Sequence, residues 1–192
     1  MTEAFVDWLV GLTDVYPPFL VGIIMLMTMV IESIIPMLPL ALFIAISKII
    51  FGDLIGFLIG WIGTTIGCCL SFYIFRKIKK TKLGRKVRRY KKVNRLLVGL
   101  NKLNFRNYVL ITAIPFTPAF SINIASGLSN VSFRKFFLMI LISKVSIVYF
   151  WGFIGKTFIE SITDFSVLVQ IGFILTVVYI ISHFVQKHFR II

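Results

Sequence analysis

Acidic side chains are scarce in this sequence, which has seven Asp and Glu against 21 Lys and Arg. Hydrophobic residues make up 58% of the chain, and the mean hydropathy is +0.97. This composition excludes an ordinary water-soluble domain and predicts one all-α, polytopic membrane domain over residues 1–192. Five apolar runs are near or above the ~20 residues that cross a bilayer. They are Pro17–Phe51, Leu54–Phe75, Tyr108–Leu128, Phe136–Ile154 and Phe165–Phe184.

Cysteine and targeting signals are also sparse. Cys68 and Cys69 are adjacent in an apolar run, which predicts small packing residues and neither a disulfide nor a metal site. The first 15 residues lack the basic region and cleavage site of a signal peptide, so they are assigned to the mature protein. Helical spacing of their large apolar residues predicts an interfacial helix at 1–15. Those residues are Phe5, Trp8, Leu9 and Leu12.

Enzyme signatures are missing. The chain has no HExxH, no phosphate-binding GxxxxGK[ST] and no GxSxG. Its two histidines, His183 and His188, have no acidic residue nearby in the sequence. We therefore expect no enzyme activity, no metal and no cofactor.

Positive charge is concentrated in one segment. Of the 21 Lys and Arg, 14 lie within 76–106, and apolar residues are interleaved with them. The positive-inside rule places this segment in the cytoplasm. The interleaved pattern predicts a basic amphipathic helix on the anionic inner leaflet. Each cation there contributes about 1 kcal/mol to the free energy of membrane binding. Anionic phospholipid is the expected partner, and nucleic acid is not, because no motif that reads DNA or RNA accompanies the charge.

Two proline pairs reveal an internal repeat. Pro36 and Pro39 in "PMLP" recur as Pro115 and Pro118 in "PFTP", and Pro115 follows Pro36 by 79 residues. The same offset superposes Ser47 on Ser126. The prediction is a first repeat over 17–75, the basic loop over 76–106 and a second repeat over 107–156.

The charge distribution predicts that the two repeats are inverted. With the basic loop inside, the segment before it runs inward and Phe136–Ile154 runs outward. A final transmembrane helix over 165–186 then returns the chain to the cytoplasmic side. Prolines three residues apart end a helix, and freed carbonyls in hydrocarbon must be buried in protein or face water. Each pair therefore predicts the tip of a re-entrant hairpin, and kinked spanning helices are the alternative.

Polar residues inside the apolar runs are the candidate substrate path. A charge at bilayer depth costs about 2.5 to 3.5 kcal/mol, which makes Glu32 and Lys144 functional candidates. Glu32 could instead be protonated or cap freed amides, and Lys144 could snorkel. Asn123 suits either a freed backbone group or a phosphate oxygen. Thr112, Ser47 and Ser126 complete the predicted path.

Small residues predict close helix packing. Gly52, Gly56, Gly60, Gly63 and Gly67 form one helical stripe, as in small-xxx-small contacts. Gly127 is assigned to the same packing group and is expected to set the turn that ends the second hairpin.

The motifs "ESIIPMLP", "IPFTPAFSINIASGLSNVSFRKFF" and "GFIGK" resemble the VTT-domain superfamily, also called DedA or SNARE-associated Golgi protein. The resemblance covers about residues 32–156 and is nearest to a bacterial branch close to the yeast Tvp proteins. It implies two opposed re-entrant hairpins and a role in moving lipids between leaflets, such as phospholipids or undecaprenyl phosphate. Glu32, the four prolines, Asn123 and Gly127 match the family's positions.

The departures from the family concern phosphate binding. Many relatives have an arginine at the position of Thr112, and DedA members proper have a second at Pro118. They also have a Gly-Glu pair where this chain has Leu40 and Ala41. Without the arginines a bidentate phosphate clamp is missing, unless a lysine supplies the charge.

The leading hypothesis is a lipid transporter, scramblase or flippase of a bacterial cytoplasmic membrane. The alternative from another class is a non-transporting membrane scaffold or envelope-homeostasis protein that binds anionic lipid or partners through the basic loop. A lipid-modifying enzyme is the weakest hypothesis. An ion or small-solute carrier stays open, because re-entrant hairpins alone do not determine which substrate is carried. A homo-oligomer also stays open.

Overall fold

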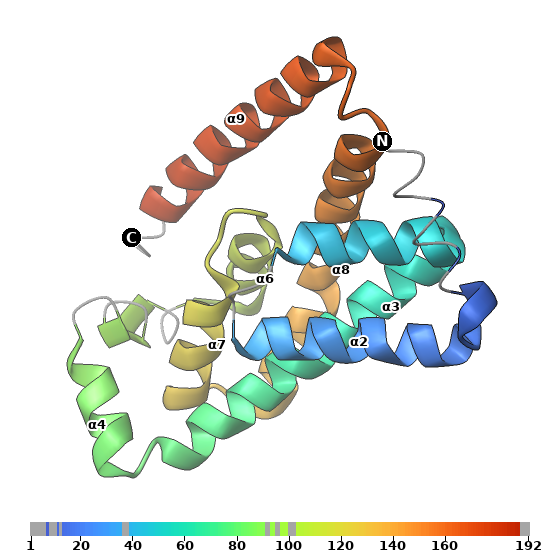
Figure 1. Cartoon of the computed structure of the whole chain (residues 1–192). Helices are drawn as coiled ribbons and strands as arrows, with labels where there is room; N and C mark the ends of the chain where they lie inside the picture. Colours follow the sequence, from blue (N-terminus) through green and yellow to red (C-terminus); the bar gives the residue numbers. More distant parts are fainter. Residues whose placement is uncertain are drawn as a thin grey trace.

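The protein is built of helices, as the computed structural model shows (Figure 1). The structure describes residues 7, 11, 13–35, 39–90, 93–94, 97–99 and 103–188, and these include no strand. The all-α prediction is therefore confirmed over this part of the chain. Pro36 and the four side chains that predict the interfacial helix at 1–15 lie outside it. The main helices are α2 (Pro18–Ile34), α3 (Leu40–Ile78), α4 (Lys82–Arg89), α6 (Phe105–Ala113), α7 (Ala119–Leu128), α8 (Phe133–Glu160) and α9 (Phe165–His188).

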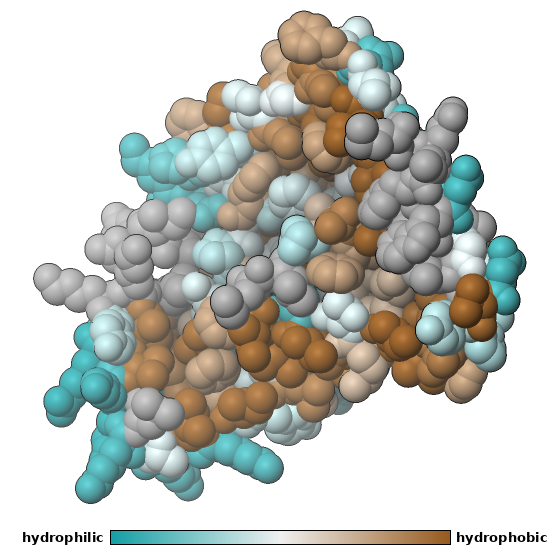
Figure 2. All heavy atoms as spheres, in the orientation of Figure 1, coloured by the Kyte–Doolittle hydropathy of each residue, from teal (hydrophilic) through white to brown (hydrophobic). Residues whose placement is uncertain are grey.

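Among the described residues, three helices are long and apolar enough to cross a membrane, namely α3, α8 and α9. In contrast, α6 and α7 have nine and ten residues. Helices of that length extend only about 14 to 15 Å, half of the ~30 Å hydrocarbon core. Apolar side chains cover broad parts of the surface, as lipid contact requires (Figure 2). The chain is therefore a membrane protein in which short apolar helices lie among three candidate spanning helices.

The helix α3 is bent at Gly52, which has φ 79° and ψ 167°. Its first part, 40–51, folds back beside the later part, and Figure 1 shows the two parts meeting at an acute angle. A Cβ on Gly52 would meet nothing within 4 Å. The prediction that Gly52 packs against another helix is therefore wrong: Gly52 sets a turn, because its positive φ disfavours residues with a side chain.

The other four glycines of the stripe permit close packing, as predicted. A Cβ on Gly56 would lie 2.5 Å from the Lys48 backbone, and one on Gly67 would lie 2.6 Å from the Val30 carbonyl oxygen. A Cβ on Gly63 would lie 2.9 Å from the Leu26 carbonyl oxygen in α2, and one on Gly60 would lie 3.0 Å from Val148 in α8 and 3.5 Å from Ile44 in the first part of α3. The stripe therefore lets the folded-back part of α3, the second half of α2 and α8 approach the later part of α3.

Gly127 also has a different role from the predicted turn. It lies inside α7, and a Cβ there would be 2.8 Å from the Phe72 carbonyl oxygen. Gly127 therefore lets α7 approach the α3 backbone. Gly152 and Gly155 do the same for α8 against the first part of α3, a contact that the sequence stripe did not reveal.

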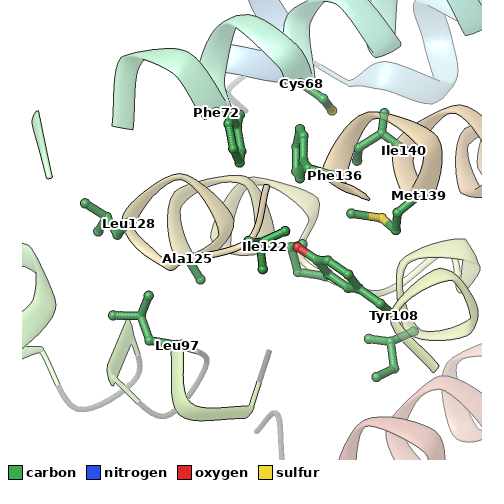
Figure 3. Packing of buried hydrophobic residues seen from close by; sticks show 12 residues of the cluster. Cys68, Phe72, Leu97, Tyr108, Ile122, Ala125, Leu128, Phe136, Met139 and Ile140 are labelled. Carbon is green, nitrogen blue, oxygen red and sulfur yellow. The ribbon is translucent and has the colours of Figure 1, made fainter. Parts of the chain in front are cut away.

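The two long helices α3 and α8 run antiparallel. Gly60 faces Val148 near one end of the contact, and the rings of Phe72 and Phe136 stack with centroids 4.4 Å apart near the other. The helix α2 packs beside the later part of α3 and runs in the same direction, and α6 packs beside α8. Figure 3 shows the core at the Phe72 end, where residues of α3, α6, α7 and α8 meet.

The 79-residue offset of the proline pairs also relates the helix ends. Ile34 ends α2 and Ala113 ends α6, while Leu40 begins α3 and Ala119 begins α7. The break between α2 and α3 and the break between α6 and α7 therefore occupy the same place in the two parts of the sequence. We call residues 35–39 the first break and 114–118 the second break.

Candidate functional site

A cavity of about 330 Å³ lies between the helix ends that flank the first break, the start of α7, and the middles of α3 and α8. We call it the central cavity. Its walls come from the end of α2, the start and middle of α3, the start of α7 and the middle of α8. The lining residues are Glu32, Ser33, Leu40, Cys68, Pro118, Ala119, Phe120, Ser121, Asn123 and Lys144.

Glu32 and Lys144 bring opposite charges to this cavity. Glu32 lies in the last turn of α2 and is 9% exposed, while Lys144 lies in the middle of α8 and is 3% exposed. The positive charge of Lys144 acts on the Glu32 carboxyl, but the two form no ion pair within 4.0 Å. An acid and a base are therefore held inside the membrane domain without direct pairing.

Asn123 supplies a side-chain amide that has no partner in the structure. It is 1% exposed, and neither its Nδ2 nor its Oδ1 makes a hydrogen bond. A buried amide without partners costs about 1 to 3 kcal/mol. Asn123 and Lys144 also line a neighbouring void of about 10 Å³, so both side chains border open space.

The second break is shaped by its own residues. In a continuing helix the Ile111 carbonyl would accept from the backbone nitrogen of residue 115, but Pro115 has no N–H. The Thr117 hydroxyl donates to the Ile111 oxygen instead, at 2.8 Å. The Thr117 N–H donates to Ile114 O at 3.1 Å and closes a turn. The freed carbonyl is thus satisfied without continuing the helix.

Both helices that follow a break begin at the central cavity. Leu40 is the first residue of α3, and Ala119 is the first of α7, with Pro118 before it. The first N–H groups of a helix have no partner within the helix and carry a partial positive charge. Two such helix ends favour a negatively charged group between them.

The structure brings together only some of the predicted path residues. Glu32, Asn123 and Lys144 line the central cavity. Thr112 borders only the small void, and its hydroxyl already donates to Tyr108 O at 2.7 Å. The remaining two are buried elsewhere: Ser126 bonds Tyr108, and Ser47 lies where the two parts of α3 touch.

The four predicted hairpin-tip prolines are placed unequally. Pro115 lies in the turn of the second break, and Pro118 precedes α7 and lines the cavity. Pro39 precedes α3 at an exposed position. Pro36 lies outside the described residues.

The basic segment begins inside a helix. Its first residues belong to α3, which continues to Ile78, and its next described helix is α4. Three of its cations reach the carboxyl end of α7, a contact that the sequence does not signal because backbone carbonyls are the acceptors. Arg76 donates to Ser126 O and Val131 O at 3.1 and 2.5 Å, Lys79 to Ser129 O at 2.6 Å and Arg88 to Leu128 O at 2.9 Å.

The surroundings of these cations differ. The Arg76 guanidinium lies 4.6 Å from the centre of the Phe72 ring, which adds a favourable contact. Burial, and then the positive charges of Arg76, Arg88 and Lys80, disfavour the charged form of Lys79 and lower its pKa, so its hydrogen bonds to Ser129 O and Asn130 Oδ1 hold it in place. Cations at a helix carboxyl end also oppose its partial negative charge. The basic segment therefore fixes α7, which carries Asn123 into the cavity.

Metal ligation finds no support in the described ranges, where no cluster of three or more His, Cys, Asp and Glu occurs. Cys68 and Cys69 are free thiols, and Cys68 packs in the core that Figure 3 shows.

This chain matches one protein family and resembles two curated proteins. Residues 35–157 match the VTT domain. The chain is 28% identical over 195 residues to the uncharacterized membrane protein YhjE of Bacillus subtilis strain 168, covering 100% of this chain and 94% of YhjE. It is 29% identical over 126 residues to the uncharacterized protein YqeD of the same strain, covering 66% of this chain and 61% of YqeD. No solved structure matches the chain. Since the VTT domain match spans most of its length, the chain belongs to the VTT-domain family.

Proposed function

We propose that the protein moves lipids between the leaflets of a bacterial cytoplasmic membrane. The head group would pass through the central cavity while the acyl chains stay in the bilayer. The observation that carries this proposal is the meeting of an acid, a base and an unpartnered amide in one cavity at the end of α2 and the starts of α3 and α7. Such a cavity supplies polar contacts where hydrocarbon supplies none.

The proposal includes two inverted re-entrant hairpins. Each would consist of the helix before a break and the helix after it: α2 with residues 40–51 of α3, and α6 with α7. The antiparallel course of α3 and α8 supports inversion, as does the shared offset of the helix ends. The short lengths of α6 and α7 support a hairpin that enters and leaves on one side.

The three polar side chains would each bind a different part of a lipid head group. Lys144 and the amino ends of α3 and α7 would attract a phosphate. Glu32 would balance the charge or attract a cationic group, and Asn123 can both donate and accept. These contacts must be weak enough for the head group to leave the cavity. Side chains that are not bonded to one another can make and break such contacts.

A scaffold is the second candidate function, favoured by the exposed cations of α4. In that role the protein would bind anionic lipid or a partner and move nothing. The two functions differ in what they require of Glu32, because a scaffold does not use the central cavity.

Leaflet exchange tests the proposal directly. Purified protein in liposomes is assayed with fluorescent phospholipids and chemical quenching of the outer leaflet. We expect Glu32→Gln to slow exchange about tenfold, equivalent to about 1.4 kcal/mol of barrier. Glu160→Gln is the matched control, since this exposed carboxylate lies at the end of α8, outside the cavity. Exchange no faster than in empty liposomes would contradict lipid transport and leave the scaffold.

A further inference from the structure

The helix α4 presents a row of cations on the side that faces away from the protein. Lys82, Arg85, Lys86 and Arg89 are exposed and lie three, one and three residues apart, which places them on one helical face. Lys80, just before α4, is exposed too. Figure 2 shows hydrophilic side chains gathered over this end of the molecule. We call the four α4 residues the outer cation row.

The opposite side of α4 packs against the protein. A Cβ on Gly84 would lie 2.1 Å from the Ile78 carbonyl oxygen, so α4 touches the end of α3. Val87 packs against the core, and Arg88 donates to Leu128 O at 2.9 Å. The apolar side of α4 is therefore used within the fold, and the outer cation row is what remains for an external partner.

The position of α4 identifies that partner. The spanning helix α3 ends at Ile78 and α4 begins at Lys82, so α4 follows directly where the chain leaves the hydrocarbon. The surface beside it is the head-group layer of the same bilayer. A row of cations at that level complements anionic phospholipid, and each such cation is worth about fivefold in lipid occupancy.

Arg88 connects this surface to the cavity. It binds Leu128 at the end of α7, and Asn123 lies five residues earlier in the same helix. That separation is about 8 Å along a rigid helix. A shift of α4 would therefore be transmitted to the Asn123 amide through the hydrogen bond from Arg88 to Leu128 and then through little more than one turn of α7.

We propose that the outer cation row binds anionic phospholipid head groups, and that this contact, passed through Arg88, steadies α7 and sets the position of Asn123 in the central cavity. The lipid site stands by itself, whereas its effect on transport rests on the proposed function. Anionic lipid is thus a regulator bound outside the path, and the cations that fix α7 are distinct from those that meet the membrane.

Hydrogen–deuterium exchange of the whole chain in nanodiscs tests the lipid site without a transport assay. Discs of phosphatidylcholine are compared with discs containing about a third phosphatidylglycerol, in which we expect amides of α4 and the last turn of α7 to exchange at least about threefold more slowly. Arg85→Gln with Arg89→Gln should abolish this effect. Arg106→Gln with Arg134→Gln is the matched control, because both arginines are exposed outside α4.

The link through Arg88 is tested by a second pair of variants. With Arg88→Gln, phosphatidylglycerol should still protect α4 but no longer α7, and Arg88→Lys should restore part of the effect on α7. Equal loss in the Arg106 and Arg134 variant would overturn a specific lipid site. Continued lipid protection of α7 in Arg88→Gln would overturn the link.

Leaflet exchange then separates regulation from transport. Phosphatidylglycerol should speed exchange by wild-type protein about threefold or more, and the Arg85 and Arg89 variant should lose this response. No exchange in either membrane would contradict the proposed function while leaving the nanodisc result intact. Exchange that is equal in both membranes would overturn the regulatory role alone.

Discussion

The carboxyl end of α7 and the central cavity are both polar and buried, yet their polar groups are treated in opposite ways. At the end of α7 and just after it, four backbone carbonyl oxygens accept from three basic side chains, although the Nε atoms of Arg76 and Arg88 have no partner of their own. In the cavity, five residues further back along α7, the Asn123 amide has no partner, and Glu32 and Lys144 make no direct ion pair. Saturated groups stabilise a fold, whereas unsaturated ones cost stability and are available to a ligand.

The largest effect on stability is expected at the saturated end. Arg76→Gln removes a cation that two carbonyls and the Phe72 ring share, and leaves those carbonyls without a donor. We expect the free energy of unfolding to fall by about 2 to 4 kcal/mol. Thermal and denaturant unfolding in detergent measure this change. Lys77→Gln, an exposed neighbour, is the control and should change stability by less than about 0.5 kcal/mol.

A smaller loss is expected at the second break. Thr117→Val keeps the shape of the side chain but removes the hydroxyl that satisfies Ile111 O. The free energy of unfolding should fall by about 1 to 2 kcal/mol. Thr176→Val is the matched control, because its exposed hydroxyl donates to Gly172 O within α9, where no break exists. An equal loss in both variants would show that the hydroxyl at the break has no special role.

The smallest change, with the opposite sign, is expected in the cavity. Asn123→Leu replaces an unpartnered amide by an apolar side chain, so the protein should become more stable by up to about 1 kcal/mol. The same variant should slow leaflet exchange in the liposome assay. A loss of stability would mean that Asn123 has a structural role, and the contrast between the two regions would then fail.

The sequence predicted the cavity residues correctly where a polar side chain stands inside an apolar segment. Glu32, Asn123 and Lys144 stand out because hydrocarbon excludes them, and the structure brings all three to one cavity. The repeat offset also predicted where helices stop, since prolines act on the backbone locally. The role of these three residues in transport stays a prediction.

The sequence could not assign roles that depend on neighbours distant along the chain. Gly52 has the spacing of the stripe. Because α3 bends at this residue, however, no neighbouring atom lies within 4 Å of where its Cβ would be. Ser47 and Ser126 share the offset yet meet different surroundings. The role of Arg76, Lys79 and Arg88 was hidden because their acceptors are backbone oxygens, which every residue has and no sequence pattern marks.

The cations that hold α7 also bear on biosynthesis. The ribosome makes Arg76, Lys79 and Arg88 before α7, so the donors are already present when its last carbonyls emerge. The end of α7 can meet them only on the side of the membrane where the basic segment was retained. If the segments that follow the basic segment were inserted in the wrong orientation while α3 kept its own, donors and acceptors would lie on opposite sides of the membrane, and the end of α7 would lack these hydrogen bonds.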